Sequence, residues 1–126
     1  MINILVIDDD EQILHFLRTT LETEGYALRL ASNGAEGILV YKRQPADLVL
    51  CDLYMDRKEG LETILELHRL FPQAKIIAMS GGSNSVPADF LDHARKFGAI
   101  ACLWKPFNRN LLLQTIQNVL NDRGNA

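Results

Sequence analysis

Five short apolar runs alternate with five helix-like patterns along this chain, and this alternation limits the fold more than any other feature. Such alternation is typical of α/β domains, in which right-handed crossovers build a parallel sheet covered on both faces. A length of 126 residues suits one domain, so we assign residues 1–126 to a single unit. The predicted strands are Asn3 to Ile7, Tyr26 to Ala31, Leu48 to Asp52, Lys75 to Met79 and Ile100 to Trp104.

The segments between these runs carry apolar residues at helical spacing, bounded by residues that start or stop helices. Small polar residues precede three of the patterns, and glycine or proline closes most of them. The signals in chain order are an Asp10 cap and a Gly25 stop, a cap at Ser32 or Asn33 and a stop at Pro45, a start after Gly60 and a stop at Pro72, a start near Pro87 and a stop at Gly98, and an Asn108 cap.

The strand order decides which side chains meet. Among the doubly wound orders open to five strands, the flavodoxin-like order 2-1-3-4-5 places the first and third strands side by side at the switch point, where ligands bind. Asp8 and Asp9 follow the first strand, and the third strand, apolar from Leu48 to Cys51, ends on Asp52. The sequence therefore predicts three carboxylates at one edge of the sheet.

Three converging carboxylates repel one another unless a cation lies between them. Oxygen ligands without nearby histidine or cysteine favour Mg²⁺ or Mn²⁺. Ser80, after the fourth strand, offers a hydroxyl at the same edge, and Lys105, after the fifth, offers an ammonium. This set can neutralise and position a phosphoryl group beside a carboxylate nucleophile, so we interpret Asp52 as a covalent phosphate acceptor.

Four motifs in this order resemble the receiver domain of bacterial two-component response regulators over the whole chain. They are Ile-Asp-Asp-Asp at residues 7–10, Asp52 with Met55 and Gly60, Met-Ser at 79–80, and Lys-Pro-Phe at 105–107. The resemblance implies a signalling receiver, chemotaxis-regulator-like, that promotes only its own phosphoryl transfer and dephosphorylation. It also implies that Asp52 accepts the phosphoryl group from a sensor histidine kinase, a phosphotransfer protein or acetyl phosphate.

The resemblance further assigns the remaining site residues. Asp9 and Asp52 would ligate Mg²⁺ directly, Asp8 through water, and Tyr54 through its backbone carbonyl. Ser80 and Lys105 would hold the phosphoryl oxygens, and the Lys105–Pro106 bond is expected to be cis. Phosphorylation would then switch an output surface that binds another protein or domain, in a monomer or a phosphorylation-dependent dimer.

Two stretches depart from the family pattern. Cys102 stands where the family usually has the tyrosine or phenylalanine of its switch, and Met55-Asp-Arg-Lys-Glu-Gly60 lacks the usual proline. Trp104 shares a strand face with Cys102, because residues two apart point the same way. We hypothesise that Trp104 anchors a partner; a core position for this tryptophan is the competing interpretation.

Three other functions compete with this one. A small Mg²⁺-dependent phosphatase of the haloacid-dehalogenase type would use an Asp-x-Asp motif, which residues 8–10 contain, with Asp8 as the nucleophile. The chain could also be a receiver excised from a regulator with a C-terminal output domain, or a degenerate receiver that is never phosphorylated. Intact Asp52 and Lys105 argue against the last.

Composition excludes several other classes. A formal net charge of −3 argues against binding to DNA or to an anionic membrane. No apolar run reaches membrane-spanning length and no signal peptide precedes the first strand, so we expect a cytoplasmic protein. Cys51 and Cys102 lie within apolar runs and are expected to stay reduced.

Overall fold

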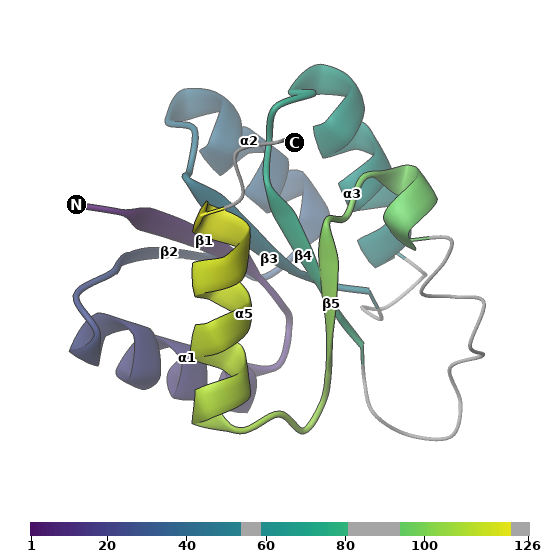
Figure 1. Ribbon diagram of the computed structural model, residues 1–126. Helices are drawn as coiled ribbons and strands as arrows, with labels where there is room; N and C mark the ends of the chain where they lie inside the picture. Colours follow the sequence, from purple (N-terminus) through teal and green to yellow (C-terminus); the bar gives the residue numbers. More distant parts are fainter. Residues whose placement is uncertain (54–58, 81–93, 122–126) are drawn as a thin grey trace.

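The computed structural model describes residues 1–53, 59–80 and 94–121. These residues form a five-stranded sheet and four helices, with a further helical turn over residues 94–97 (Figure 1). The elements are β1 (Asn3–Ile7), α1 (Glu11–Thr23), β2 (Ala27–Ala31), α2 (Gly34–Arg43), β3 (Leu48–Asp52), α3 (Glu59–Leu70), β4 (Ile76–Ser80), β5 (Ala101–Trp104) and α5 (Arg109–Asn121).

All neighbouring strands are parallel and the order is β2-β1-β3-β4-β5, which confirms the predicted topology. Ile7 pairs with Cys51, and Asp52 pairs with Met79. The carboxyl ends of β1, β3 and β4 therefore meet at one edge of the sheet. This is the edge at which open α/β sheets bind ligands.

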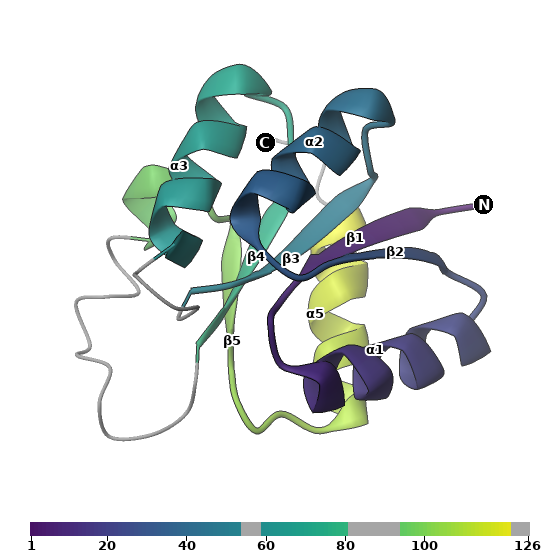
Figure 2. The same cartoon turned by 180° about the vertical axis from the view of Figure 1, so that it is seen from behind.

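Helices cover both faces of the sheet, with α1 and α5 on one side and α2 and α3 on the other (Figure 2). Successive strand residues point to opposite faces. Leu5 and Ile7 pack under α2 and α3, whereas Ile4 and Val6 pack under α1 and α5. All five residues of β3 are buried, as the unbroken apolar run predicts.

The predicted caps act as expected where the structure describes them, but α3 already includes Glu59 and Gly60, although its start was predicted after Gly60. The Asp10 carboxylate accepts the Gln12 amide at 2.9 Å, and Asn108 accepts the Leu111 amide at 2.7 Å. Of the two candidates for the second cap, Asn33 is the one used, accepting the Glu36 amide at 2.8 Å. The predicted start near Pro87 lies outside the described residues.

Four strand boundaries, in three of the strands, differ from the predicted ones by a single residue. The second strand begins at Ala27, because the Tyr26 amide donates to the Leu21 carbonyl and so closes α1. The fourth spans Ile76–Ser80, which makes Ser80 the last strand residue, and the fifth begins at Ala101. No described helix has the length and hydropathy needed to cross a bilayer.

Candidate functional site

Three aspartates meet at the carboxyl edge of the sheet. Asp8 and Asp9 follow β1, and Asp52 is the last residue of β3, the strand paired with β1. One carboxylate oxygen from each residue lies within 4.8 Å of the others. The convergence predicted from strand order is therefore present.

The three aspartates differ in their surroundings. Asp8 has no exposed surface and Asp52 is 4% exposed, whereas Asp9 faces solvent. Oδ1 of Asp8 accepts the Asp10 amide at 2.9 Å, which ties the buried carboxylate to the first turn of α1. A buried carboxylate needs such partners to remain charged.

Lys105 supplies the positive charge. It follows β5, and its Nζ atom lies 2.8 Å from Oδ2 of Asp8 and 3.4 Å from Oδ1 of Asp52. Burial by itself lowers the pKa of this ammonium, but the hydrogen bond to Asp8 and the charges of Asp52 and Asp8 outweigh burial, so its pKa is raised above 10.5. The lysine therefore stays charged at neutral pH.

Lys105 does not neutralise the negative charge of the three aspartates. Three carboxylates and one ammonium leave two formal negative charges within a few ångströms. The available metal ligands are hard carboxylate oxygens, and the carboxylate of Asp9 is open to solvent. A divalent ion such as Mg²⁺, which takes one or two carboxylates and keeps several waters, fits both this charge and this donor set.

Ser80 lies at the same edge, at the end of β4. Its hydroxyl is buried and has no hydrogen-bond partner among the described residues. The carbonyl of Ser80 accepts the Lys105 amide at 2.7 Å, so the β4–β5 ladder holds serine and lysine next to each other. A buried hydroxyl without a partner is costly, which suits a group that bonds only to a ligand.

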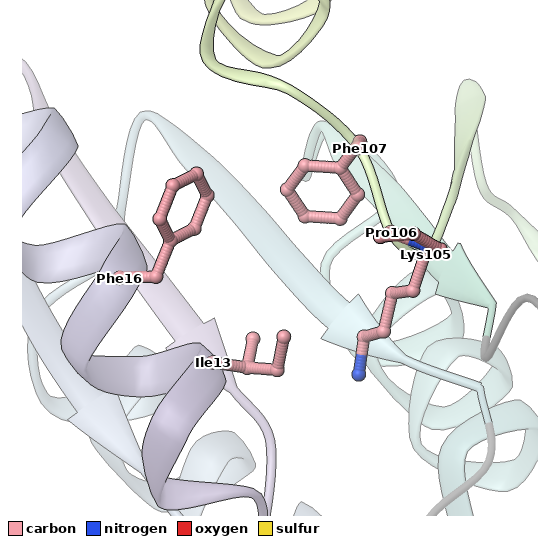
Figure 3. Close-up of a pocket in the computed structure, with 5 residues that line it drawn as sticks. All are labelled: Ile13, Phe16, Lys105, Pro106 and Phe107. Atoms are coloured by element: carbon pink, nitrogen blue, oxygen red, sulfur yellow. The ribbon is translucent and has the colours of Figure 1, made fainter.

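An apolar pocket adjoins the lysine (Figure 3). It measures about 220 Å³ and lies between Ile13 and Phe16 of α1 and the segment Lys105, Pro106 and Phe107. The rings of Phe16 and Phe107 stand 6.2 Å apart at 56°. The Lys105–Pro106 bond is cis. The side chain of Lys105 thus lines the pocket while its ammonium reaches the acids.

The other predicted residues divide into two groups. Tyr54 falls outside the described residues. Cys102 is partly buried against the core beneath α2 and α3, and burial raises the pKa of its thiol despite the opposing charge of Arg95. Trp104 is 40% exposed, so it is not a core residue.

Sequence reasoning missed two features of the site. It gave no role to Ile13 and Phe16, although their spacing of three residues on α1 places them on one face. It also used Gly60 only as part of a motif, whereas a Cβ atom there would collide with the backbone of Asp52 and Leu53. Neither feature can be found without the packing of helix on strand.

The family comparison agrees with this geometry. Residues 4–117 match the model of the response regulator receiver domain. The chain belongs to this family of two-component signalling receivers, which is not a family of catalytic enzymes. Its acidic Asp8, Asp9 and Asp52 pocket is typical of receivers that accept phosphate.

Individual relatives cover the chain almost completely. It is 31% identical over 117 residues to the chemotaxis protein CheY of Halobacterium salinarum, covering 93% of this chain and 95% of that protein. A CheY-like receiver domain protein from Methanospirillum hungatei superposes with a TM-score of 0.88 at 30% identity, covering 96% of this chain and 94% of that one.

Longer regulators also match. The transcriptional regulatory protein GlrR of Escherichia coli is 32% identical over 124 residues, which are 98% of this chain but 27% of that protein. The chain thus spans about a quarter of the length of the transcriptional regulators it resembles.

Proposed function

We propose that this receiver accepts a phosphoryl group on Asp52 and thereby switches a surface that binds a partner. The observation that carries the proposal is the placement of the Lys105 ammonium 3.4 Å from the Asp52 carboxylate, in a cluster with Asp8 and Asp9. The donor is a sensor histidine kinase, a phosphotransfer protein or a small acyl phosphate. As a receiver of such a system, the protein works in the cytoplasm.

Phosphoryl transfer to Asp52 forms one bond to phosphorus and breaks another. An Oδ atom of Asp52 attacks phosphorus and forms a new O–P bond, while the bond from phosphorus to the donor breaks. That donor atom is the imidazole nitrogen of a phosphohistidine or the acyl oxygen of acetyl phosphate, and it leaves with the electron pair. Lys105 and the Ser80 hydroxyl lie where they can bind the phosphoryl oxygens, and such positioning and charge neutralisation carry most of the catalysis in phosphoryl transfer.

The proposed metal ligands are Asp9 and Asp52 directly, Asp8 through water, and the backbone carbonyl of Tyr54. When bound, Mg²⁺ supplies positive charge to offset the phosphoryl oxygens. Asp8 is poorly suited to the alternative role of phosphatase nucleophile. Its side chain is fully buried, and its two oxygens already bond to Lys105 and to the Asp10 amide.

The test is incubation with acetyl phosphate and Mg²⁺, followed by mass mapping of the acyl phosphate. We expect one phosphoryl group on Asp52, absent from Asp52→Asn and present in Asp47→Asn, a control that neutralises an exposed aspartate. A label on Asp8, or steady hydrolysis of unrelated phosphate esters, would overturn the proposal.

The pocket of Figure 3 offers the donor protein a place to bind beside the acceptor. Its apolar walls suit an aliphatic or aromatic side chain, and it shares Lys105 with the acid cluster. We expect Phe16→Ala to slow phosphoryl transfer from a phosphorylated kinase about tenfold and to leave transfer from acetyl phosphate within about twofold. Equal losses with both donors would exclude this role.

Trp104 supports a second contact, on the output side. It is 40% exposed on the edge strand β5, and exposed tryptophans are frequent anchors of interfaces. We expect Trp104→Ala to weaken binding of the output partner at least tenfold in pull-down titrations without changing the fold. Leu39→Ala, which truncates an exposed leucine on α2, is the control. Unchanged affinity in Trp104→Ala would exclude the anchor.

A further inference from the structure

Gly60 lies in the first turn of α3, directly over the end of the strand that carries Asp52. A Cβ atom built on it would collide with the carbonyl oxygen of Asp52 and would lie 2.5 Å from both Cα and C of Leu53. Real Cβ atoms essentially never approach other heavy atoms below 3.0 Å. The helix can therefore approach this peptide only because the residue has no side chain.

The neighbouring strand β4 also holds the Asp52–Leu53 peptide. The Leu53 amide donates to the Met79 carbonyl at 2.7 Å, and Asp52 pairs with Met79 in the β3–β4 ladder. Leu53 is fully buried, so it has no free space in which to retreat. The Asp52–Leu53 peptide is thus fixed between β4 and α3.

The position of this peptide sets the position of the carboxylate. Asp52 must keep its oxygen 3.4 Å from Lys105 and within 4.8 Å of the oxygens of Asp8 and Asp9. These partners follow β1 and β5, and none of them lies on α3 or on β3. A displacement of the Asp52 backbone therefore pulls one member out of a cluster whose other members stay in place.

We propose that Gly60 is a positioning residue for the phosphoacceptor: its missing side chain lets α3 press the Asp52 backbone into the place where the carboxylate meets Lys105 and the other acids. The proposal deepens the function proposed above and rests on it for the role of Asp52. It also predicts an effect on metal binding that requires no phosphoryl transfer.

Gly37 provides a matched control. It also lies inside a helix, α2, where alanine is intrinsically favoured over glycine by about 1 kcal/mol. A Cβ atom there would collide with Cδ1 of Ile7 and would lie 2.7 Å from Cγ1 of the same side chain. These atoms belong to the buried side chain of Ile7, so alanine at Gly37 displaces a core side chain, whereas alanine at Gly60 displaces the backbone of Asp52. The two substitutions thus add the same methyl group and differ in what it meets.

The experiment compares Gly60→Ala, Gly37→Ala and wild type in buffer containing sucrose, which favours the folded state. Three quantities are measured: the free energy of unfolding, Mn²⁺ affinity by electron paramagnetic resonance, and the rate constant of phosphorylation by acetyl phosphate at saturating Mg²⁺. We expect Gly60→Ala to weaken Mn²⁺ binding about threefold or more and to slow phosphorylation about tenfold or more, as a small misplacement of a reacting group does. Gly37→Ala should stay within about twofold of wild type in both.

A purely structural role gives a different result. If both variants lose metal affinity in proportion to lost stability, or if Gly60→Ala stays within twofold of wild type, the positioning role is excluded. Failure of Gly60→Ala to fold in sucrose, while Gly37→Ala folds, would likewise assign the glycine to the fold and overturn the proposal. Absence of label on Asp52 in wild type would instead remove the proposed function, while the Mn²⁺ comparison would still test Gly60.

Discussion

The Nζ atom of Lys105 lies 2.8 Å from Oδ2 of Asp8, a carboxylate with no exposed surface, and 3.4 Å from Oδ1 of Asp52. The lysine thus occupies the acid cluster as its internal cation. A metal ion and this ammonium compete for the same negative charge, because both are stabilised by the same oxygens.

Replacing Lys105 with methionine tests this competition. We expect Lys105→Met to bind Mg²⁺ roughly tenfold more tightly than wild type, because a positive charge about 3 Å from two of the ligands is removed. Isothermal titration with MgCl₂ measures the affinity. Lys42→Met, which removes the same charge from an exposed site on α2, should leave it unchanged. Weaker binding by Lys105→Met would contradict the competition.

The same variant should be less stable in the absence of metal. Asp8 would keep its hydrogen bond from the Asp10 amide but lose its cation, and a buried carboxylate that loses its partner is destabilising. We expect a loss of about 3 kcal/mol in the free energy of unfolding, measured by urea denaturation. Added Mg²⁺ should restore more stability to Lys105→Met than to wild type. An equal gain in both would show that the lysine and the metal act independently.

The raised pKa of Lys105 predicts how stability depends on pH. The ammonium binds its proton more tightly in the folded state, so its contribution is complete below pH 10.5 and is lost as pH rises through the folded-state pKa. Tyr41 acts in the same direction, because burial and the charge of Asp47 raise its pKa above 10.0. We therefore expect the free energy of unfolding to fall above pH 10.

Two variants separate these contributions. Tyr41→Phe removes the tyrosine titration and leaves the lysine, whereas Lys105→Met removes the lysine and leaves the tyrosine. Each should flatten part of the decline above pH 10 in urea denaturation at graded pH. A decline that is as steep in Lys105→Met as in wild type would show that the lysine has the same proton affinity in the folded and unfolded chains.

Removing the Ser80 hydroxyl should affect stability and phosphorylation in opposite ways. Its hydroxyl is buried without a partner among the described residues, so removing it also removes a desolvation cost. We expect Ser80→Ala to be as stable as wild type or more stable by about 1 kcal/mol, yet to be phosphorylated by acetyl phosphate more slowly. Ser32→Ala, which removes an exposed hydroxyl that donates to the Glu36 carboxylate, should leave the rate of phosphorylation unchanged and should not raise stability. A clear loss of stability in Ser80→Ala would show that the hydroxyl has a partner in the metal-free protein.

The sequence predicts the frame of this site well, for physical reasons that are local. An unbroken apolar run marks β3 as a buried central strand, and the abrupt change to a carboxylate marks its end at Asp52. Strand order then brings Asp8 and Asp9 beside Asp52. The preference of Lys105 for Asp8 over Asp52 depends on side-chain packing across the edge of the sheet, which no spacing in the sequence encodes.

Boundaries and close approaches were harder to predict because tertiary contacts decide them. Tyr26 fits a strand by composition, but its amide closes α1 instead of joining the sheet. Gly60 fits an ordinary helix start, but the backbone of Asp52 lies where its side chain would be. Trp104 fits a core position or a surface position equally well by sequence, and in the structure it is 40% exposed, whereas its neighbour Leu103 on β5 is buried.

The Lys75 side chain holds the end of α5. Its Nζ atom donates to the Val119 carbonyl at 3.2 Å and lies 3.4 Å from the Leu120 carbonyl. The last carbonyls of a helix have no partners within the helix, and a positive charge near them interacts favourably with the negative end of the helix dipole.

We expect Lys75→Met to lower the free energy of unfolding by about 1 kcal/mol and to speed hydrogen exchange in the last turn of α5. Lys42→Met is again the control, and phosphorylation of Asp52 should be unaffected, because Lys75 precedes β4 at the opposite end of the sheet from the acids. Unchanged exchange in α5 would show that the helix end is held by other contacts.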